Sequence, residues 1–205
     1  RRQRQMCIRD SRLARPDSKN ILIVGAGTVG QSLFDAYSAA FPKANFLVWN
    51  RTHERALYMV KNKSNAVAVE NLEAGVKRAD IITCATMSKQ PIIKGEWLIP
   101  GQHLDLIGAY RPDMREVDDL ALCRSTKFVD SYDTTLDHIG ELKIPLKNNV
   151  ISRADILADF YGLGNFIRRS NDEITFFKNG GGAHLDLIVA KYILTAWEKN
   201  KYPKS

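Results

Sequence analysis

The chain has 205 residues, of which 44% are hydrophobic, and this length and composition predict one large domain with a substantial core. Its net charge of +7 would favour a nucleic-acid partner if it were spread over the surface. However, residues 1–15 contain six arginines and one aspartate and so carry most of that charge. We therefore expect 1–15 to be a disordered or non-native basic tail, and the nearly neutral body to bind no nucleic acid.

The sequence carries no signal for a membrane, a metal or a disulfide. No apolar stretch is long enough to cross a bilayer, and the arginine-rich start is not followed by the apolar segment of a signal peptide. The three cysteines, Cys7, Cys84 and Cys123, show no metal-binding spacing and indicate reduced thiols. We expect a cytoplasmic protein with no bound metal and no membrane partner.

The most specific local pattern lies at 20–30. An apolar run over 21–24 leads directly into G-x-G-x-x-G, formed by Gly25, Gly27 and Gly30, and helix-spaced apolar residues follow over 28–40. A buried strand, a glycine turn and a helix start occur in this order in dinucleotide-binding sites. Gly25 would permit the tight turn, Gly27 the approach of a pyrophosphate, and Gly30 the close packing of helix and strand. The free N–H groups at the helix start would bind the anion.

The second predicted strand, 46–49, indicates which nucleotide is bound. It ends in Asn50, Arg51 and Thr52, at the place where an NAD-selective site usually has an acidic residue for the ribose 2′-hydroxyl. A carboxylate would repel a 2′-phosphate, whereas the guanidinium of Arg51 would attract it, and Asn50 and Thr52 add neutral donors. The sequence therefore predicts NADP(H) in preference to NAD(H). The alternative is that Arg51 is an ordinary solvated arginine.

Helices and strands continue to alternate as far as residue 130. The expected helices cover 54–63, 72–78 and 115–123, and the expected strands cover 66–69, 80–84, 102–107 and 127–130, with an irregular stretch over 91–100. This alternation is typical of an α/β protein with a doubly wound parallel sheet, the Rossmann fold. Ligands of such sheets lie at the carboxyl ends of the strands, so we expect one continuous rim formed by 28–29, 50–52, 84–87 and 107–111.

Beyond residue 130 the pattern changes. We expect a helix over 151–161 with Ser152 as its N-cap, a strand over 174–177, and a long helix over 184–197. The three glycines at 180–182 form either a hinge or a place where the backbone approaches the nicotinamide. We interpret 16–150 as an NADP-binding Rossmann domain, and 151–205 as a C-terminal, largely helical segment that completes it and returns toward a further lobe.

Several motifs together resemble the ornithine cyclodeaminase/mu-crystallin family, which includes cyclodeaminases, alanine dehydrogenases and ketimine reductases. These motifs are V-G-A-G-T-V-G, W-N-R-T, A-T-M, G-A-Y-R-P-D-M-R-E-V-D-D and F-F-K-N-G-G-G-A-H-L-D-L. The resemblance extends over 13–197, and the last two motifs are more specific than the glycine turn. It implies a nicotinamide cofactor, a small imino- or amino-acid substrate and a homodimer for the full-length protein.

The resemblance also implies roles for individual residues. Those expected to bind the pyrophosphate are Gly25, Ala26, Gly27, Thr28, Val29 and Gly30. Those expected to bind the 2′-phosphate are Asn50, Arg51 and Thr52. Those expected to line the nicotinamide half are Cys84, Ala85, Thr86, Met87, Ile107, Gly108 and Gly181. Tyr110 and Arg111 are candidates for substrate contact. Arg115, Glu116 and Asp118 are expected to fix the loop through a buried ion pair.

Two departures from the family pattern matter. Cyclodeaminases and archaeal alanine dehydrogenases carry a catalytic aspartate just after the fifth strand, where this chain has Tyr110. A tyrosine cannot serve as that carboxylate base near neutral pH, which favours imine reduction, unless Tyr110 only packs. In addition, the family's N-terminal lobe, which holds the substrate carboxylate and much of the dimer surface, is not found. We therefore expect a fragment whose proton donor lies in that lobe.

The reaction implied by the resemblance is NADPH-dependent reduction of a cyclic ketimine carboxylate, such as pyrroline- or piperideine-2-carboxylate, to the cyclic amino acid. The cofactor would supply the hydride, and the protein would align and protonate the imine. The alternatives are an ornithine cyclodeaminase and a non-catalytic, crystallin-like NADPH-binding protein. Among the histidines, we expect His103 to be structural, His138 to lie on the surface, and His184 to have a helix-end role.

Overall fold

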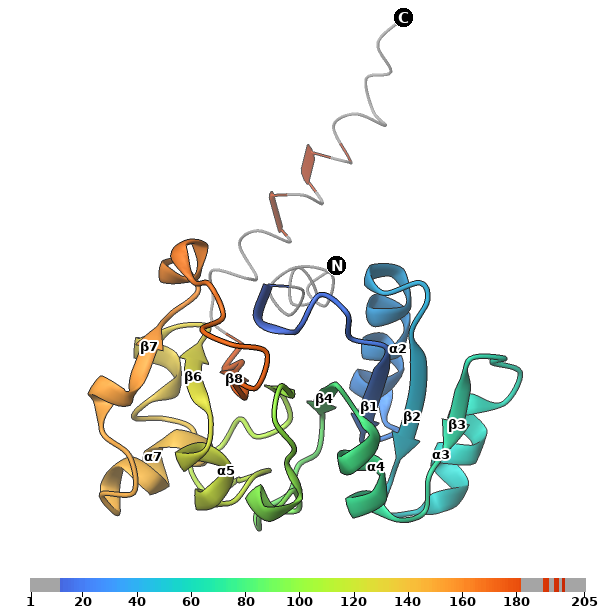
Figure 1. Ribbon diagram of the computed structural model, residues 1–205, viewed down its shortest axis with the longest axis horizontal. Helices are drawn as coiled ribbons and strands as arrows, with labels where there is room; N and C mark the ends of the chain where they lie inside the picture. Colours follow the sequence, from blue (N-terminus) through green and yellow to red (C-terminus); the bar gives the residue numbers. More distant parts are fainter. Residues whose placement is uncertain (1–11, 182–189, 192–193, 196, 198–205) are drawn as a thin grey trace, which may run out of the picture.

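The computed structural model describes residues 12–181, 190–191, 194–195 and 197 (Figure 1). Its strands are β1 (Asn20–Val24), β2 (Asn45–Trp49), β3 (Ala66–Ala68), β4 (Ile81–Cys84), β5 (His103–Leu106), β6 (Thr126–Val129), β7 (Ile156–Ala158) and β8 (Thr175–Lys178). All eight strands form one sheet, in the order β3-β2-β1-β4-β5-β8-β6-β7, and every neighbouring pair is parallel. The expected α/β fold with a parallel sheet is therefore confirmed.

Helical segments connect the strands. The α-helices are α2 (Thr28–Ala40), α3 (His53–Val60), α4 (Leu72–Arg78), α5 (Asp119–Cys123), α6 (Tyr132–Thr135) and α7 (Gly140–Lys147), and the 3₁₀ turns are η1 (Gly95–Trp97), η2 (Arg153–Asp155) and η3 (Gly162–Asn165). Within the described part of the chain, no helix has the length and apolar character needed to cross a membrane.

The alternation of side chains along β1 divides the core between the two faces of the sheet. Ile21 and Ile23 belong to a cluster with residues of α2 and α3, including Phe34 and Met59. Leu22 belongs to a second cluster, with residues of α4 and α5. Because successive strand residues point to opposite faces, an entirely apolar β1 requires helices on both sides of the sheet. This is the physical basis of the doubly wound arrangement.

The strand order reverses at β1, and this reversal positions the candidate site. The chain runs outward from β1 to β2 and β3, then returns through α4 to β4 on the other side of β1. The connections leaving the carboxyl ends of β1 and β4 therefore diverge and leave a crevice between them, which is where open α/β sheets bind ligands.

The C-terminal part of the sheet corrects one expectation. The helix expected over 151–161 is wrong, because this stretch forms η2 and then β7, which pairs with β6. Ser152 is an N-cap as expected, and it forms a capping box with Asp155, but the turn that it caps lasts only three residues. A capping signal predicts where a helix begins and not how far it continues, and here the edge of β6 takes the following residues as a strand.

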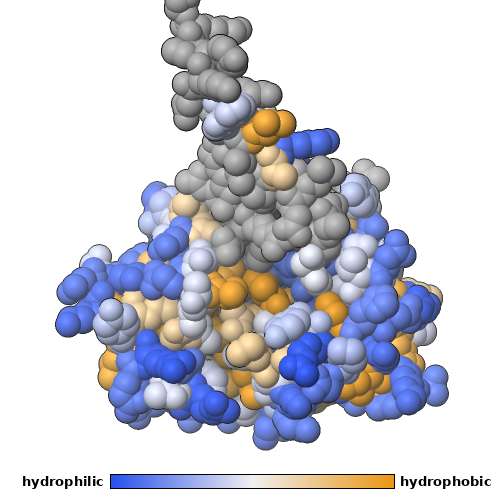
Figure 2. All heavy atoms as spheres, turned by 180° about the vertical axis from the view of Figure 1, so that it is seen from behind, coloured by the Kyte–Doolittle hydropathy of each residue, from blue (hydrophilic) through white to orange (hydrophobic). Residues whose placement is uncertain are grey.

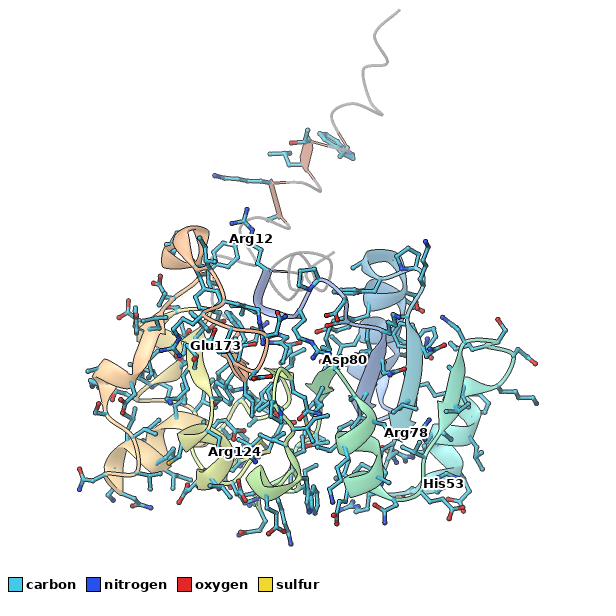
Figure 3. The ribbon with its side chains drawn as sticks, in the orientation of Figure 1. Arg12, His53, Arg78, Asp80, Arg124 and Glu173 are labelled. Atoms are coloured by element: carbon cyan, nitrogen blue, oxygen red, sulfur yellow. The ribbon has the colours of Figure 1, made fainter. Side chains whose placement is uncertain are left out.

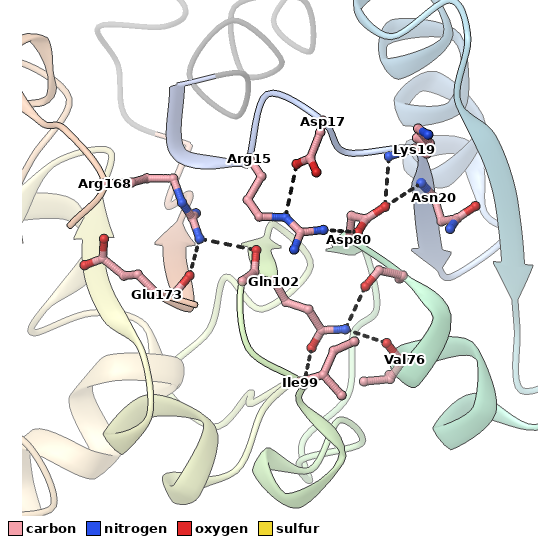
Figure 4. Close-up of polar contacts among 12 residues, drawn as sticks. Arg15, Asp17, Lys19, Asn20, Val76, Asp80, Ile99, Gln102, Arg168 and Glu173 are labelled. Carbon is pink, nitrogen blue, oxygen red and sulfur yellow. Dashed lines mark hydrogen bonds and ion pairs between the residues drawn. The ribbon is translucent and has the colours of Figure 1, made fainter. Parts of the chain in front are cut away.

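The start of the described chain corrects a second expectation. Residues 12–15 belong to the folded body, because Leu13 is fully buried against Phe128 and Phe177. Arg15 Nη2 lies 2.6 Å from Asp80 Oδ1 (Figure 4). Arg168 also donates to the Leu13 carbonyl. The arginine-rich composition of 1–15 predicted a solvated tail. It is the burial of Leu13, which composition does not show, that distinguishes an anchored segment from such a tail.

The same polar network holds the amino ends of three strands together. Asp80 Oδ2, just before β4, accepts from the backbone N–H groups of Lys19 and Asn20 at 2.8 and 2.9 Å (Figure 4). Gln102, just before β5, is 1% exposed and donates to the carbonyls of Val76 and Ala79 at 2.6 and 2.7 Å. These contacts satisfy backbone groups at the edge of the sheet opposite the candidate site.

The surface is mixed in character. Figure 2 shows hydrophilic side chains along much of the outline of the molecule and hydrophobic ones near the centre of the face seen from behind. Exposed apolar residues of the expected rim include Val29, Met87 and Tyr110, which are 45%, 72% and 57% exposed. The rim therefore offers apolar as well as polar contacts to a ligand.

Candidate functional site

The glycine turn after β1 is shaped by two backbone contacts. Gly25 has a φ of +112°, and a Cβ there would lie 2.8 Å from the carbonyl oxygen of Ala85. A Cβ on Gly30 would lie 1.9 Å from the carbonyl oxygen of Gly25, so the first turn of α2 packs directly on the loop. Gly27 has open space around its Cβ position and is the N-cap of α2, with no side chain capping the helix. The first N–H groups of α2 thus face an open surface that can accept an anion.

Asn50 connects the glycine turn to the loop after β2. Its Oδ1 accepts from the N–H of Ala26 at 3.0 Å, and its Nδ2 donates to the carbonyl of Thr52 at 2.9 Å. The sequence predicted Asn50 to be a donor for the phosphate, but both ends of its amide are used within the protein. The backbone N–H of Ala26, in the glycine turn, is likewise occupied by this hydrogen bond within the protein. Asn50 therefore holds the two loops at a fixed spacing.

A hollow of ≈ 390 Å³ lies at the carboxyl ends of β1, β2 and β4. It brings together eight residues of the predicted cofactor site: Gly25, Gly27, Asn50, Arg51, Thr52, Ala85, Thr86 and Met87. Its remaining lining residues are Trp49, Arg55, Ser88 and Ile92. A second hollow, of ≈ 620 Å³, lies between α2 and α3 and includes Ala26 and Thr28. Gly27 and Arg55 line both hollows, so the two adjoin.

The other predicted cofactor residues do not line either hollow. Gly30 and Cys84 are buried in the backbone framework. The carbonyl of Cys84 accepts from the N–H groups of Ile107 and Gly108 at 2.9 and 3.1 Å, so these three residues shape the rim through their main chain. Burial and the nearby charge of Glu116 raise the pKa of the Cys84 thiol, which makes it an unreactive thiol.

Val29 and Gly181 also lie outside the two hollows. Val29 is exposed on the first turn of α2. Gly181 has a φ of +73°, and its N–H donates to Asn179 Oδ1 at 2.9 Å. Gly182, His184 and most of the helix expected over 184–197 lie outside the described residues.

A buried carboxylate joins the loops after β4 and β5. Glu116 Oε1 accepts from the backbone N–H and the hydroxyl of Thr86 at 2.8 and 2.9 Å, and its Oε2 accepts from the N–H of Ala109 at 3.1 Å. Gly108, in the loop after β5, contacts the loop after β4 so closely that a Cβ on it would be 1.9 Å from the Thr86 carbonyl oxygen. Glu116 therefore positions both sides of the rim on which the nicotinamide half is expected.

Beneath Glu116 lies a second buried carboxyl group. Glu141 accepts from the N–H groups of Glu116 and Val117 at 2.7 and 3.1 Å. Burial, and next the charge of Glu116, raise the pKa of Glu141 to about 7, with the ammonium of Lys178 acting in the opposite direction. Lys178 is itself fully buried and donates to the carbonyl of Leu106 at 3.0 Å. The rim thus lies on a layer of buried charges that supports the loops.

Arg115, Glu116 and Asp118 have structural roles as expected, but they do not form one ion pair. The ion pair is formed by Arg115 Nη1 and Asp119 Oδ1 at 2.7 Å, on one side of the short helix α5. Glu116 and Asp118 instead accept from backbone N–H groups, and Asp118 caps α5 while also accepting from Gly95 at 2.8 Å. Because Asp118 is the N-cap and α5 begins at Asp119, the helix expected over 115–123 is shorter at its start.

The proposed substrate residues lie on the loop that follows β5. Tyr110 and Arg111 are exposed, and the Arg111 guanidinium lies 3.6 Å from Asp113 Oδ1. Neither side chain lines the two hollows. His103 is buried, with Nδ1 2.9 Å from Thr175 Oγ1, and His138 is exposed, in line with their predicted roles. No cluster of metal-ligating side chains occurs among the residues that the structure describes.

Sequence reasoning missed Arg55 as a lining residue and Asn50 as a residue that positions loops. It expected Glu116 to fix a loop, but through an ion pair and not through the backbone N–H groups of Thr86 and Ala109. The only signal for Arg55 was its place near the start of a predicted helix, close to Arg51 in the sequence. Because Arg51 precedes that helix, the spacing of helix residues did not link the two side chains. No sequence signal links Glu116 to Thr86 or Asn50 to Ala26, because each contact joins residues that are 30 and 24 positions apart.

Comparison with known proteins identifies the family of this chain independently of the site geometry. A family model described as the ornithine cyclodeaminase/mu-crystallin family matches residues 7–201. The Delta(1)-pyrroline-2-carboxylate reductase of Paracoccus denitrificans is 50% identical over 191 residues, covering 89% of this chain and 60% of that protein. The ketimine reductase mu-crystallin of Mus musculus is 32% identical over 197 residues, covering 93% of this chain and 60% of that protein.

A solved structure shows the same fold. The Delta(1)-pyrroline-2-carboxylate reductase of Thermococcus litoralis, in complex with NADH and L-proline, superimposes with a TM-score of 0.87 at 30% identity. The match covers 93% of this chain and 62% of that one. This chain therefore spans about three-fifths of the length of these relatives.

Proposed function

Because the chain belongs to the ornithine cyclodeaminase/mu-crystallin family, we propose that the whole protein reduces a cyclic ketimine carboxylate with NADPH. The substrate would be a pyrroline- or piperideine-2-carboxylate, and the product would be the cyclic amino acid. The observation that carries this proposal is the 50% identity to a pyrroline-2-carboxylate reductase, in a chain whose sheet opens a crevice at the expected reversal point. The chain covers 60% of that relative, so the proposal concerns the complete protein.

The nucleotide would lie along the hollow at the carboxyl ends of β1, β2 and β4. The open N–H groups at the start of α2 suit the pyrophosphate, and the exposed guanidinium of Arg51 suits a 2′-phosphate. Thr86 and Met87 would line the side toward the nicotinamide ribose. The Thermococcus relative was solved with NADH, so the preference for NADP(H) depends on this chain's own Arg51 and on the lack of an acid at 49–52.

The bound cofactor would supply a hydride to the imine carbon. The residues of this chain would bind and orient: Glu116 keeps the loops carrying Thr86 and Ala109 at a fixed spacing, which defines the place available to the nicotinamide half. Tyr110 and Arg111 would contact the substrate, whose carboxylate a guanidinium can bind through two parallel hydrogen bonds.

Three further features belong to the same proposal. The full-length protein would be a homodimer in the cytoplasm, and residues 151–205 would complete the cofactor domain and lead toward a further lobe. The family resemblance supports these features. The placement of β7 and β8 within the main sheet supports the role of 151–205 in completing the domain.

The test is a steady-state assay of the full-length protein with Δ1-pyrroline-2-carboxylate and either NADPH or NADH. We expect oxidation of both cofactors, with the higher kcat/KM for NADPH, and we expect Arg51→Gln to remove most of the difference. If neither cofactor is oxidised, the reductase proposal fails. Conversion of L-ornithine to proline and ammonia without net change in the cofactor would favour a cyclodeaminase, and tight binding of NADPH without any turnover would favour a non-catalytic protein.

A further inference from the structure

Arg55 occupies the boundary between the two hollows. It lies in the first turn of α3, where its N–H donates to the carbonyl of Thr52 at 3.1 Å, and its residue is exposed. It lines the ≈ 390 Å³ hollow together with Arg51, and it also lines the ≈ 620 Å³ hollow between α2 and α3. His53, which begins α3, marks this part of the molecule at the lower right of Figure 3.

The charges around this boundary are unbalanced. No acidic residue lines the first hollow in the part of the chain that the structure describes, whereas Arg51 and Arg55 both do. The nearby carboxylate of Glu70 lies 3.7 Å from His53 Nε2, and no ion pair within the described residues involves Arg51 or Arg55. Two guanidinium groups at one hollow without a carboxylate partner favour an anionic ligand.

The second hollow differs, because Glu54 lines it. A carboxylate there disfavours a phosphate on that side of Arg55, by direct repulsion between like charges. The side of Arg55 that faces Arg51 is therefore the favourable one for a doubly charged phosphate.

We propose that Arg55 is a second determinant of cofactor specificity and binds the 2′-phosphate of NADP(H) together with Arg51. This inference rests on the proposed use of NADP(H). Arg51 precedes the N-cap Thr52 and Arg55 lies one turn later, so the two side chains reach the same hollow from the loop and from the helix. A phosphate offers three acceptor oxygens, and the planar fork of one guanidinium binds two of them in a bidentate pair.

The test uses the adenosine end of the cofactor alone. Adenosine 2′,5′-bisphosphate and AMP are titrated by calorimetry into the full-length protein and into Arg51→Gln, Arg55→Gln and Arg55→Lys. The matched control is Arg153→Gln, whose exposed ion pair with Asp137 lies near β7, at the opposite end of the sheet from β3. We expect Arg55→Gln to lower the affinity for the bisphosphate roughly tenfold and to leave the affinity for AMP unchanged. We expect Arg55→Lys to recover part of the affinity for the bisphosphate.

The outcomes separate this inference from the proposal beneath it. If Arg51→Gln lowers the affinity for the bisphosphate and Arg55→Gln does not, the role of Arg55 is refuted while the preference for NADP(H) stands. If Arg55→Gln weakens both ligands equally, Arg55 acts on the site in general and not on the 2′-phosphate. If the unaltered protein binds AMP and the bisphosphate equally well, both the preference and the role of Arg55 are wrong.

Discussion

At the scale of single residues, we expect Glu141 to make the stability of this protein depend on pH. Its pKa is raised to about 7 from an ordinary 4.5, chiefly by burial and then by the charge of Glu116. The folded state therefore retains a proton that the unfolded chain releases. Stabilisation from this group is complete below about pH 4.5 and is lost as the pH rises through about 7, a change on the order of 3 kcal/mol. Urea unfolding across this pH range measures it.

The variant Glu141→Gln provides the comparison. A glutamine stays neutral at every pH, so we expect the free energy of unfolding of the variant to change less between about pH 5 and pH 8 than that of the parent. The variant loses one of the two acceptors for the N–H groups of Glu116 and Val117, so its stability should be lower at acidic pH. Parallel pH profiles for the two proteins would show that Glu141 does not titrate in this range.

At the scale of elements, Asp80 connects the segment before β1 to the start of β4. Its carboxylate accepts from two backbone N–H groups and pairs with Arg15, and its side chain is 18% exposed. We expect Asp80→Ala to lower the free energy of unfolding by about 1 to 3 kcal/mol, because two N–H groups at the edge of the sheet lose a charged acceptor. Chemical denaturation measures this loss.

A matched control for Asp80 is Asp137→Ala. Asp137 pairs with Arg153 at 2.5 Å, but the two side chains are 65% and 61% exposed, so solvent screens the pair. We expect this variant to unfold at a denaturant concentration indistinguishable from that of the parent. Equal losses for the two variants would contradict a special role of Asp80 at the amino end of the sheet.

At the scale of the whole molecule, β8 makes the sheet depend on residues late in the chain. It lies between β5 and β6 and pairs with both. A chain that ends at residue 150 would lack β7 and β8, which would leave the edges of β5 and β6 unpaired and remove Leu163, Phe166 and Phe177 from the cluster around Phe128. We expect this truncated chain to fail to fold and the 205-residue chain to fold. Circular dichroism and proton NMR dispersion distinguish the two, and a well-dispersed spectrum of the truncated chain would contradict the expectation.

Local sequence patterns determined much of the fold and of the candidate site. The apolar run before Gly25, the spacing of the three glycines and the residues Asn50 to Thr52 predicted a parallel α/β sheet and the edge at which a nucleotide would lie. The parallel sheet is confirmed, because such patterns reflect constraints within one strand, one turn and one helix. The place of the nucleotide stays a prediction. The motif over residues 108–119 likewise predicted the family. A motif of this kind is recognised from residue types and their spacing along the chain, which can be read from the primary sequence alone.

Only the tertiary structure decided which distant residues meet. It inserted β8 between β5 and β6, ended the turn after Ser152 at three residues, and buried Leu13 beneath Phe128. It also used Asn50 and Glu116 to position loops. These outcomes depend on strand pairing, burial and hydrogen bonds between segments far apart in the chain. The free energy of such contacts depends on which surfaces are buried against each other, away from water. A local sequence pattern does not contain this information.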